Sequence, residues 1–245
     1  MYDVLKKKYG QNFLIDKNIL RKITNLIPKC NLDILEIGPG SGKLTDEILY
    51  KKPSKITLVE IDKDLMPNLY SKYKDIDNIN LINQDVLNFE IKDKYDLVIS
   101  NLPYNISSQI LVKLTTLEKP PKKLIFMFQK EFSKRLLDTK LNSINSLIKC
   151  FYKVTFNFNV GRNCFRPIPK IDSSVITFDK KKEVLINFNE IDNFISFKRN
   201  LFSHKRKKLG NLLKNYNLED KFDLNLRVER LDLLDLIRIF RLINS

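Results

Sequence analysis

The chain has 245 residues, of which 43% are hydrophobic and 30% are charged, a balance typical of a soluble globular protein with one sizeable core. Three scattered cysteines, a single histidine and the lack of a long apolar run exclude a disulfide scaffold, a zinc site and a membrane-spanning helix. The net charge of +15 favours a polyanionic partner, although a lysine-rich composition that only keeps the protein soluble explains the same number.

Short apolar runs alternate with helical patterns from the N-terminus to about residue 178. The runs predicted as strands are 33–37, 55–61, 78–84, 95–100, 123–128, 154–160 and 173–178. Helical patterns over 43–50, 64–73 and 107–117 lie between the early runs. This alternation predicts an α/β fold with a seven-stranded, mostly parallel sheet, whose last two strands pair antiparallel across a short turn-rich link.

The pattern changes after the lysines at 180–182. Residues 190–202, 204–216 and 228–243 are predicted as amphipathic helices, because their apolar residues recur at helical spacing. We therefore divide the chain into an α/β domain at 1–179 and a small C-terminal helical domain at 180–245.

A glycine-rich turn, IGPGSG (37–42), joins the first predicted strand to a helix. Its glycines allow the backbone to turn tightly and to approach a ligand closely. The turn does not meet the dinucleotide fingerprint GxGxxG, because Lys43 stands in place of the third glycine, and the Walker phosphate loop is absent. Taken alone, the turn could simply connect a strand to a helix.

Carboxylates stand at the ends of the next two strands, at Glu60 and at Asp85. Open α/β sheets bind ligands at the carboxyl ends of their strands. Glu60 can accept hydrogen bonds from the hydroxyls of a ribose, and Asp85 can accept one from an adenine amine. A cofactor with adenine and ribose but no phosphate suits these acids better than NAD, and S-adenosylmethionine has that composition.

The fourth strand ends in Asn101-Leu102-Pro103-Tyr104 at the same edge. An amine on a planar base is a poor nucleophile, because its lone pair is delocalised into the ring. The Asn101 side-chain oxygen and the carbonyl of Leu102 or Pro103 can hold the two N–H bonds of such an amine and favour its pyramidal form. Tyr104 offers a flat face on which an extruded base can stack. Catalysis then depends on alignment and electrostatics, without a His or Cys nucleophile.

The motifs resemble those of the ribosomal RNA adenine dimethyltransferases, the KsgA type and its Erm relatives. The Asn-Leu-Pro-Tyr motif after a GxGxG turn is typical of amino methyltransferases as a group. More particular segments follow the family's order nearly from end to end, namely KKKYGQNFLID (6–16), MFQKEFSKRL (127–136), FRPIPKIDSSV (165–175), FSHKRKKLGNLL (202–213) and RVERLDLLDL (227–236). Leu102 is similar to the KsgA type, because Erm enzymes usually carry isoleucine there.

The resemblance implies a Rossmann-like class I methyltransferase domain that binds S-adenosylmethionine and no metal. The cofactor-binding residues that it implies are Gln11, Asn12 and Leu14 over the cofactor, Gly38 at its methionine part with Gly40 in the same turn, Glu60 at the ribose, Asp85 at the adenine and Asn101 at the reacting amine. It also implies that Phe165 clamps the target base against Tyr104, although an aromatic residue there could instead anchor a loop to the core.

The implied reaction methylates the N6 amines of two neighbouring adenines near the 3′ end of small-subunit ribosomal RNA, on an immature small subunit. We expect a cytoplasmic monomer without a membrane partner. Two alternatives stay open: an Erm-like enzyme of the large subunit, and a nucleic-acid-binding factor that kept the fold and lost catalysis. Leu102 weighs against the first, and the intact motif at 101–104 weighs against the second.

The chain departs from the family pattern at one place. Family members usually have a Tyr-Gly-Arg-Leu-Ser segment where this chain has KLNSINSL (140–147), which contains no arginine. The difference puts a local RNA contact in question and does not affect the chemistry.

The positions of the basic residues give meaning to the net charge. Residues 180–245 carry 15 Lys and Arg against 9 Asp and Glu, a net of +6 over 66 residues, so the charge is denser there than in the rest of the chain. A surface that follows RNA phosphates is therefore a better interpretation than an ordinary solvated helix face. The RNA-binding residues that we predict are Lys198, Arg199, Lys205, Arg206, Lys207 and Lys208.

Overall fold

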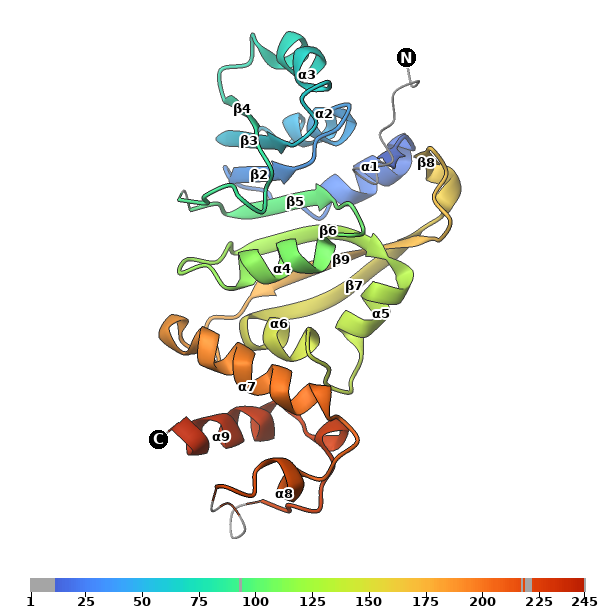
Figure 1. Ribbon diagram of the computed structural model, residues 1–245. Coiled ribbons are helices and arrows are strands. Elements are labelled where there is room, and N and C mark those ends of the chain that lie inside the picture. Colours follow the sequence, from blue (N-terminus) through green and yellow to red (C-terminus); the bar gives the residue numbers. More distant parts are fainter. Residues whose placement is uncertain (1–11, 93, 217, 219–221, 245) are drawn as a thin grey trace.

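The computed structural model describes residues 12–92, 94–216, 218 and 222–244. Its centre is a seven-stranded sheet with the strand order β4-β3-β2-β5-β6-β9-β7 (Figure 1). The first five strands in this order run parallel, and β9 is antiparallel to both β6 and β7. The strands are β2 (Asp33–Ile37), β3 (Lys55–Glu60), β4 (Ile79–Asn83), β5 (Leu97–Asn101), β6 (Lys123–Gln129), β7 (Tyr152–Val160) and β9 (Ser173–Lys180). The predicted mostly parallel sheet is confirmed.

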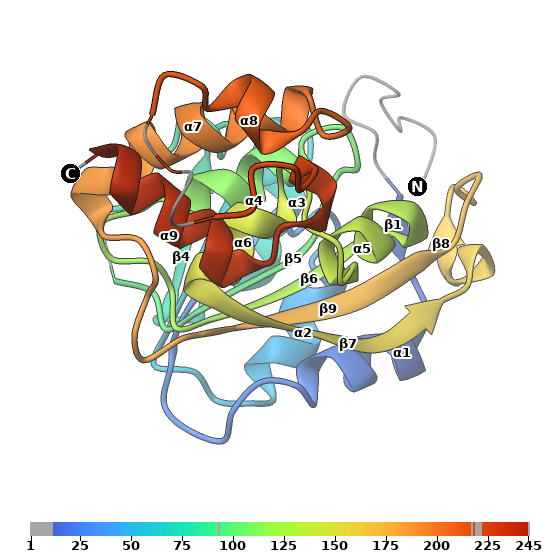
Figure 2. The same ribbon diagram turned by 90° about the horizontal axis from the view of Figure 1, so that it is seen from below.

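Helices cover both faces of this sheet (Figure 2). One face carries α1 (Lys17–Thr24), α2 (Lys43–Leu49) and α3 (Met66–Tyr73), and the other carries α4 (Ser107–Thr115), α5 (Lys130–Leu137) and α6 (Asn145–Phe151). Neighbouring residues of β2 belong to different clusters: Ile34 packs under α1–α3, and Leu35 packs under α4–α6. Successive side chains of a strand point to opposite faces, so a strand buried on both sides is apolar at most of its positions.

The C-terminal segment packs against the side of the molecule that carries α6. It contains α7 (Ile191–Ser203), α8 (Leu209–Leu212) and α9 (Leu233–Asn244) (Figure 1). The rings of Phe194 in α7 and Phe240 in α9 lie 5.2 Å apart, centroid to centroid, and belong to the same hydrophobic cluster as Leu147 of α6. The proposed division after residue 179 falls near the end of β9 and stays a prediction, because the buried side chains form one cluster across it.

The structure corrects two helix predictions in this segment. Residues 204–216 do not form one helix, because the chain there pairs with residues 224–226: the Leu209 N–H donates to the Leu226 carbonyl and the Gly210 N–H to the Leu224 carbonyl, each at 2.9 Å. The helix predicted at 228–243 begins only at Leu233. Residues 228–230 form a single 3₁₀ turn, Leu231 is extended, and the Asp232 side chain accepts the Asp235 N–H as a new start.

A two-stranded pair that the sequence did not predict joins the two ends of the α/β part. β1 (Phe13–Leu14) is antiparallel to β8 (Phe165–Arg166), with Leu14 opposite Phe165. The Ile15 N–H extends the contact by donating to the Cys164 carbonyl at 2.8 Å. Segments of two residues are too short to show any periodicity, but this pair brings the motifs at 6–16 and 165–175 side by side.

Tyr73 braces the glycine turn after β2 from outside. Its hydroxyl donates to the Gly42 carbonyl at 2.7 Å and lies 2.8 Å from the Asp46 carboxylate. Gly42 has a left-handed φ of +76°, and a Cβ at this position would overlap the Tyr73 hydroxyl. A glycine is therefore required at this position, because Tyr73 of α3 contacts the turn there. The contact holds the turn in place at the carboxyl edge of the sheet.

Gly42→Ala is expected to lower the free energy of unfolding by about 2–4 kcal/mol, because the methyl group displaces Tyr73 and the left-handed backbone is unfavourable for alanine. Urea unfolding measures the change. Gly161→Ala is the matched control, since its φ is −66° and no atom lies within 4 Å of the added Cβ. Equal stability of the two variants would contradict the proposed bracing.

Candidate active site

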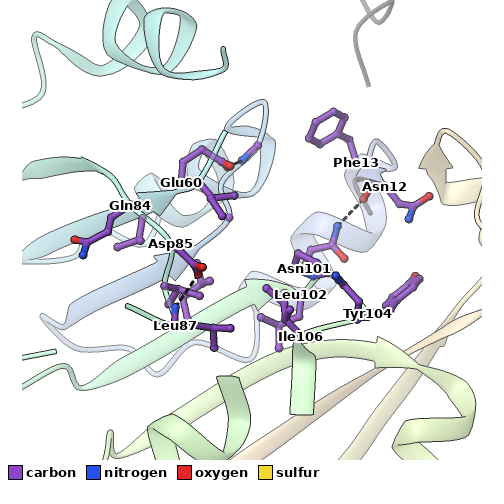
Figure 3. A pocket seen from close by; sticks show the side chains of 18 residues that line it. Asn12, Phe13, Glu60, Gln84, Asp85, Leu87, Asn101, Leu102, Tyr104 and Ile106 are labelled. Atoms are coloured by element: carbon purple, nitrogen blue, oxygen red, sulfur yellow. Dashed lines mark hydrogen bonds between the residues drawn. The ribbon is translucent and has the colours of Figure 1, made fainter. Parts of the chain in front are cut away.

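A cavity of about 180 Å³ lies at the carboxyl ends of β2, β3, β4 and β5 (Figure 3). The turn after β2, the last residue of β3, the segment after β4 and the end of β5 each contribute to its wall, and the segment just before α1 lies across it. The residues predicted from the sequence that line it are Asn12, Gly38, Gly40, Glu60, Asp85, Asn101, Leu102, Pro103 and Tyr104. The structure thus brings most of the predicted site residues together.

Glu60 connects the end of β3 to the glycine turn. It is only 4% exposed, and its carboxylate accepts the Gly40 N–H at 3.0 Å with one oxygen and the Asp62 N–H at 2.9 Å with the other. Burial raises the pKa of Glu60, while the two N–H groups act in the opposite direction. A carboxylate can accept about four hydrogen bonds in all, so the group can still accept one from a ribose hydroxyl.

The glycines of the turn face the cavity in different ways. A Cβ at Gly38 would meet no protein atom within 4 Å, so the space in front of this residue is open. A Cβ at Gly40 would overlap the Phe13 ring, so the absence of a side chain there lets Phe13 pack against the turn. Gly38 therefore leaves room for a ligand, and Gly40 leaves room for the Phe13 ring, which is part of the cavity wall.

Asp85 is the second residue after β4. One of its carboxylate oxygens accepts the Leu87 N–H at 2.9 Å (Figure 3). Ile61, Val86 and Leu102 line the cavity with it. An acid beside apolar side chains suits an adenine ring, which has apolar faces and an N–H edge.

The end of β5 presents an amide with a fixed orientation. The Asn101 Nδ2 donates to the Asn12 carbonyl at 2.9 Å, so its nitrogen faces the N-terminal segment (Figure 3). This bond leaves the Asn101 Oδ1 as an acceptor in the cavity wall. The Tyr104 hydroxyl and the Ser173 hydroxyl lie 2.7 Å apart, and burial raises the pKa of Tyr104 above its usual value. Its ring is held in place, and its hydroxyl stays neutral at pH 7.

Tyr104 also borders a second hollow. A groove of about 750 Å³ lies between α4, α5 and α7, and its wall includes Tyr104, Lys113, Arg135 and Arg199. One aromatic side chain therefore stands between the small cavity and the larger groove.

Two residues expected at the cofactor or the base lie elsewhere, and Gln11 lies outside the described residues. Leu14 is 5% exposed and packs in the cluster under α1, because extended residues alternate and Phe13 takes the cavity side. Phe165, opposite Leu14, is fully buried in the same cluster and does not line the cavity. In this structure it has no exposed face to stack on a base, so it anchors β8 to the core.

The predicted RNA-binding residues divide into one buried and five exposed side chains. Lys198 is 6% exposed, and its ammonium group donates to the Ser143 carbonyl at 2.6 Å. Burial, together with the charge of Arg199, lowers the pKa of Lys198 to about 8. Lys198 therefore fastens α7 to the segment before α6, and only a small part of it is exposed in the wall of the groove. The exposed residues are Arg199, Lys205, Arg206, Lys207 and Lys208.

Sequence reasoning missed Phe13, Ile61, Gln84, Val86, Leu87 and Ile106, which also line the cavity. Ile61 and Gln84 directly follow strand ends, so the carboxyl-edge rule could have found them. In the described part of the chain, no group of three or more His, Cys, Asp or Glu is arranged to hold a metal ion, and no helix is long and apolar enough to cross a membrane.

The fold and the cavity together define a Rossmann-like class I methyltransferase, a class that takes S-adenosylmethionine as its methyl donor. The chain matches the family "Ribosomal RNA adenine dimethylase" over residues 3–244, and it belongs to that family.

Named relatives cover nearly the whole chain. "Ribosomal RNA small subunit methyltransferase A" of Hydrogenobaculum sp. (strain Y04AAS1) is 40% identical over 96% of this chain and 92% of its own. The protein of the same name from Mycoplasma mobile is 42% identical over 87% and 85%. A dimethyladenosine transferase from Plasmodium falciparum is similar in structure, with a TM-score of 0.79, 27% identity and coverage of 94% and 97%. The 23S rRNA methyltransferase ErmE shares the fold at 22% identity, with a TM-score of 0.76 and coverage of 96% and 100%.

The cavity fits S-adenosylmethionine by its own chemistry. Open space at Gly38 can take the methionine part, the Glu60 carboxylate retains lone pairs for the ribose, and Asp85 stands among apolar residues where an adenine fits. Among the described residues that line the cavity, none is a lysine or an arginine, which suits a cofactor without a phosphate.

Glu36 lies beneath the glycine turn, in the interior of β2. It is 1% exposed and accepts the Thr45 hydroxyl of α2 at 2.7 Å. Burial raises the pKa of Glu36 to about 8, and the nearby Asp46 and Glu60 act in the same direction. At pH 7 the side chain is therefore mostly a neutral acid that joins the strand to the helix across the turn.

The protonated Glu36 predicts a pH-dependent stability. A folded-state pKa above the ordinary value of 4.5 stabilises the fold fully below pH 4.5, and this contribution is lost as the pH rises towards about 8. Glu36→Gln stays neutral, so its free energy of unfolding should rise relative to wild type between pH 5 and pH 8. Urea unfolding at both pH values measures this. A difference between the two proteins that does not change with pH would show that Glu36 does not titrate in this range.

Proposed function

We propose that this protein transfers methyl groups from S-adenosylmethionine to the N6 amines of adenines in small-subunit ribosomal RNA. The observation that carries the proposal is that the Asn101–Tyr104 motif lies on the same cavity as Gly38, Glu60 and Asp85. An amine acceptor site thus adjoins a site suited to the methyl donor. The names of the relatives, which specify the small ribosomal subunit, support the choice of RNA.

The resemblance carries the proposal further. It favours two neighbouring adenines near the 3′ end, each methylated twice, in an immature small subunit. It also favours a monomer that works in the cytoplasm without a membrane partner. The division into a methyltransferase domain at 1–179 and a helical RNA-binding domain at 180–245 belongs to the same proposal.

The cofactor supplies an electrophilic methyl group on a sulfonium sulfur. The chain's own task is to hold the amine in line with that group. The Asn101 Oδ1 accepts one N–H of the amine, since the Asn101 nitrogen is occupied by the Asn12 carbonyl. The Pro103 carbonyl already accepts the Ile106 N–H at 3.3 Å in the turn before α4, so the Leu102 carbonyl is the better second acceptor.

Tyr104 contributes a surface and no proton transfer. Its hydroxyl is engaged with Ser173 and its raised pKa keeps it neutral, which makes it a poor base. Its ring instead stacks on the extruded adenine and limits the base to one plane. The barrier is then lowered by orientation and by two acceptors that favour developing positive charge on nitrogen.

Asn101→Ala is expected to reduce methylation of undermethylated small subunits by about 10²–10³-fold, because one acceptor of the amine is lost. Mass spectrometry of dimethyladenosine measures the rate, and titration with S-adenosylhomocysteine measures cofactor affinity, which should change far less. Asn80→Ala, at an exposed position of β4, is the control. A normal methylation rate in Asn101→Ala would refute the catalytic assignment.

The exposed basic residues after α7 generate a second test. Lys205→Gln with Arg206→Gln should weaken RNA binding and reduce the slope of log affinity against log salt by about 2, since each phosphate contact contributes about 1. Lys63→Gln with Lys74→Gln removes the same charge near α3, at the other end of the molecule (Figure 1), and is the control. An unchanged salt slope would mean that RNA does not contact this surface, and a parallel loss of S-adenosylhomocysteine binding would mean that the variant is unfolded.

A further inference from the structure

Lys113 is a half-buried lysine whose ammonium group is directed at a single loop. It lies in α4, and its Nζ donates to the carbonyls of Val86 at 2.9 Å, Leu87 at 2.8 Å and Phe89 at 2.7 Å. An ammonium group has three hydrogens, so these bonds use all of its donors. The three acceptors belong to the segment after β4, which has no regular secondary structure.

The same segment forms one wall of the cofactor cavity. Asp85, Val86 and Leu87 all line the cavity, while Lys113 reaches their main chain from the opposite side. Asp85 holds the segment from within: its carboxylate accepts the Leu87 N–H, and its carbonyl accepts the Asn88 and Phe89 N–H groups at 3.0 and 2.9 Å. Lys113 adds the attachment of this small turn to α4.

Charge and burial agree with a role directed at this loop. Burial lowers the pKa of Lys113, and the charge of Asp85 acts in the opposite direction, so the acid at the start of the loop favours the charged ammonium group that holds it. Hydrogen bonds that involve a charged donor contribute more than neutral ones, and a loop without a ladder depends on such bonds for its orientation.

Lys113 also lines the groove beyond Tyr104, where a lysine could instead contact RNA phosphates. Its three hydrogens are already bonded to main-chain carbonyls, which leaves none for a phosphate. The contacts therefore favour the cofactor side over the RNA side.

We propose that Lys113 is a positioning residue that fixes the loop 85–89 and so presents Asp85 and Val86 to the adenine of the cofactor. The inference rests on the proposed function, because it requires the cavity to bind S-adenosylmethionine. Lys113 itself touches neither the cofactor nor the base and acts through the loop.

The test is titration of the full chain with S-adenosylhomocysteine in the absence of RNA. Lys113→Met removes the charge and keeps the length of the side chain, and it is expected to raise the Kd about tenfold. Lys113→Arg keeps a charged donor and should stay within about threefold of wild type. Lys149→Met is the matched control, because the Lys149 ammonium group also donates to a main-chain carbonyl, that of Asp138, away from the cavity.

Steady-state kinetics separate positioning from a general loss of structure. In Lys113→Met the KM for S-adenosylmethionine should rise about tenfold, while kcat at saturating cofactor and the KM for RNA stay within about threefold of wild type. Thermal unfolding without ligand checks that Lys113→Met and Lys149→Met are both folded, and only Lys113→Met should change the Kd. If Lys113→Met does not fold, Lys113→Gln carries the same expectations.

Three outcomes would overturn the inference. An unchanged Kd in Lys113→Met, with wild type binding normally, removes the positioning role and leaves the proposed function intact. A raised KM for RNA with unchanged S-adenosylhomocysteine binding assigns Lys113 to the groove instead. A wild-type protein that binds no S-adenosylhomocysteine overturns the proposed function, and this inference with it.

Discussion

The Glu60 carboxylate accepts the Gly40 N–H and so ties the end of β3 to the turn that follows β2. Other contacts support the same turn: Glu36 and Thr45 join strand and helix beneath it, and Tyr73 holds the Gly42 carbonyl from outside. Each is buried, so each unpaired partner would be costly, and the turn is over-determined. The cavity depends on this rigid turn, because the space in front of Gly38 stays open only if the neighbouring residues cannot move into it.

The end of β5 depends on the same edge of the sheet. The side chain of Asn101 is oriented by the main chain of Asn12, and that segment is in turn held by the β1–β8 pair. Tyr104 is oriented by Ser173 of β9. The amide and the aromatic ring of one short motif are thus fixed by two parts of the chain that lie far from it in sequence. Rigid support of this kind is what a reaction governed by alignment requires.

The strands and the carboxyl-edge residues could be predicted because they depend on local patterns. The central strands are mostly apolar runs that are buried on both faces, and the boundaries of all seven predicted strands agree with the structure within two residues. The errors arose where a distant partner decides the conformation. Residues 204–216 have helical periodicity, but the main chain of 224–226 competes for their N–H groups. Leu14 and Phe165 belong to family motifs, but side chains alternate between the two faces of the β1–β8 pair, and these two point into the core. Lys198 stands in a basic run, and only the fold shows that its ammonium group meets Ser143.

Tyr104 stands where a chamber of about 180 Å³ meets a groove of about 750 Å³. Under the proposed function, the RNA chain follows the groove, and the target base passes Tyr104 to reach the cavity. A single unstacked nucleotide can pass the ring, whereas a base that remains paired brings its complementary strand with it and stays outside. RNA segments whose bases unstack easily would then be favoured. Single-stranded loops would be selected without recognition of base sequence in a double helix.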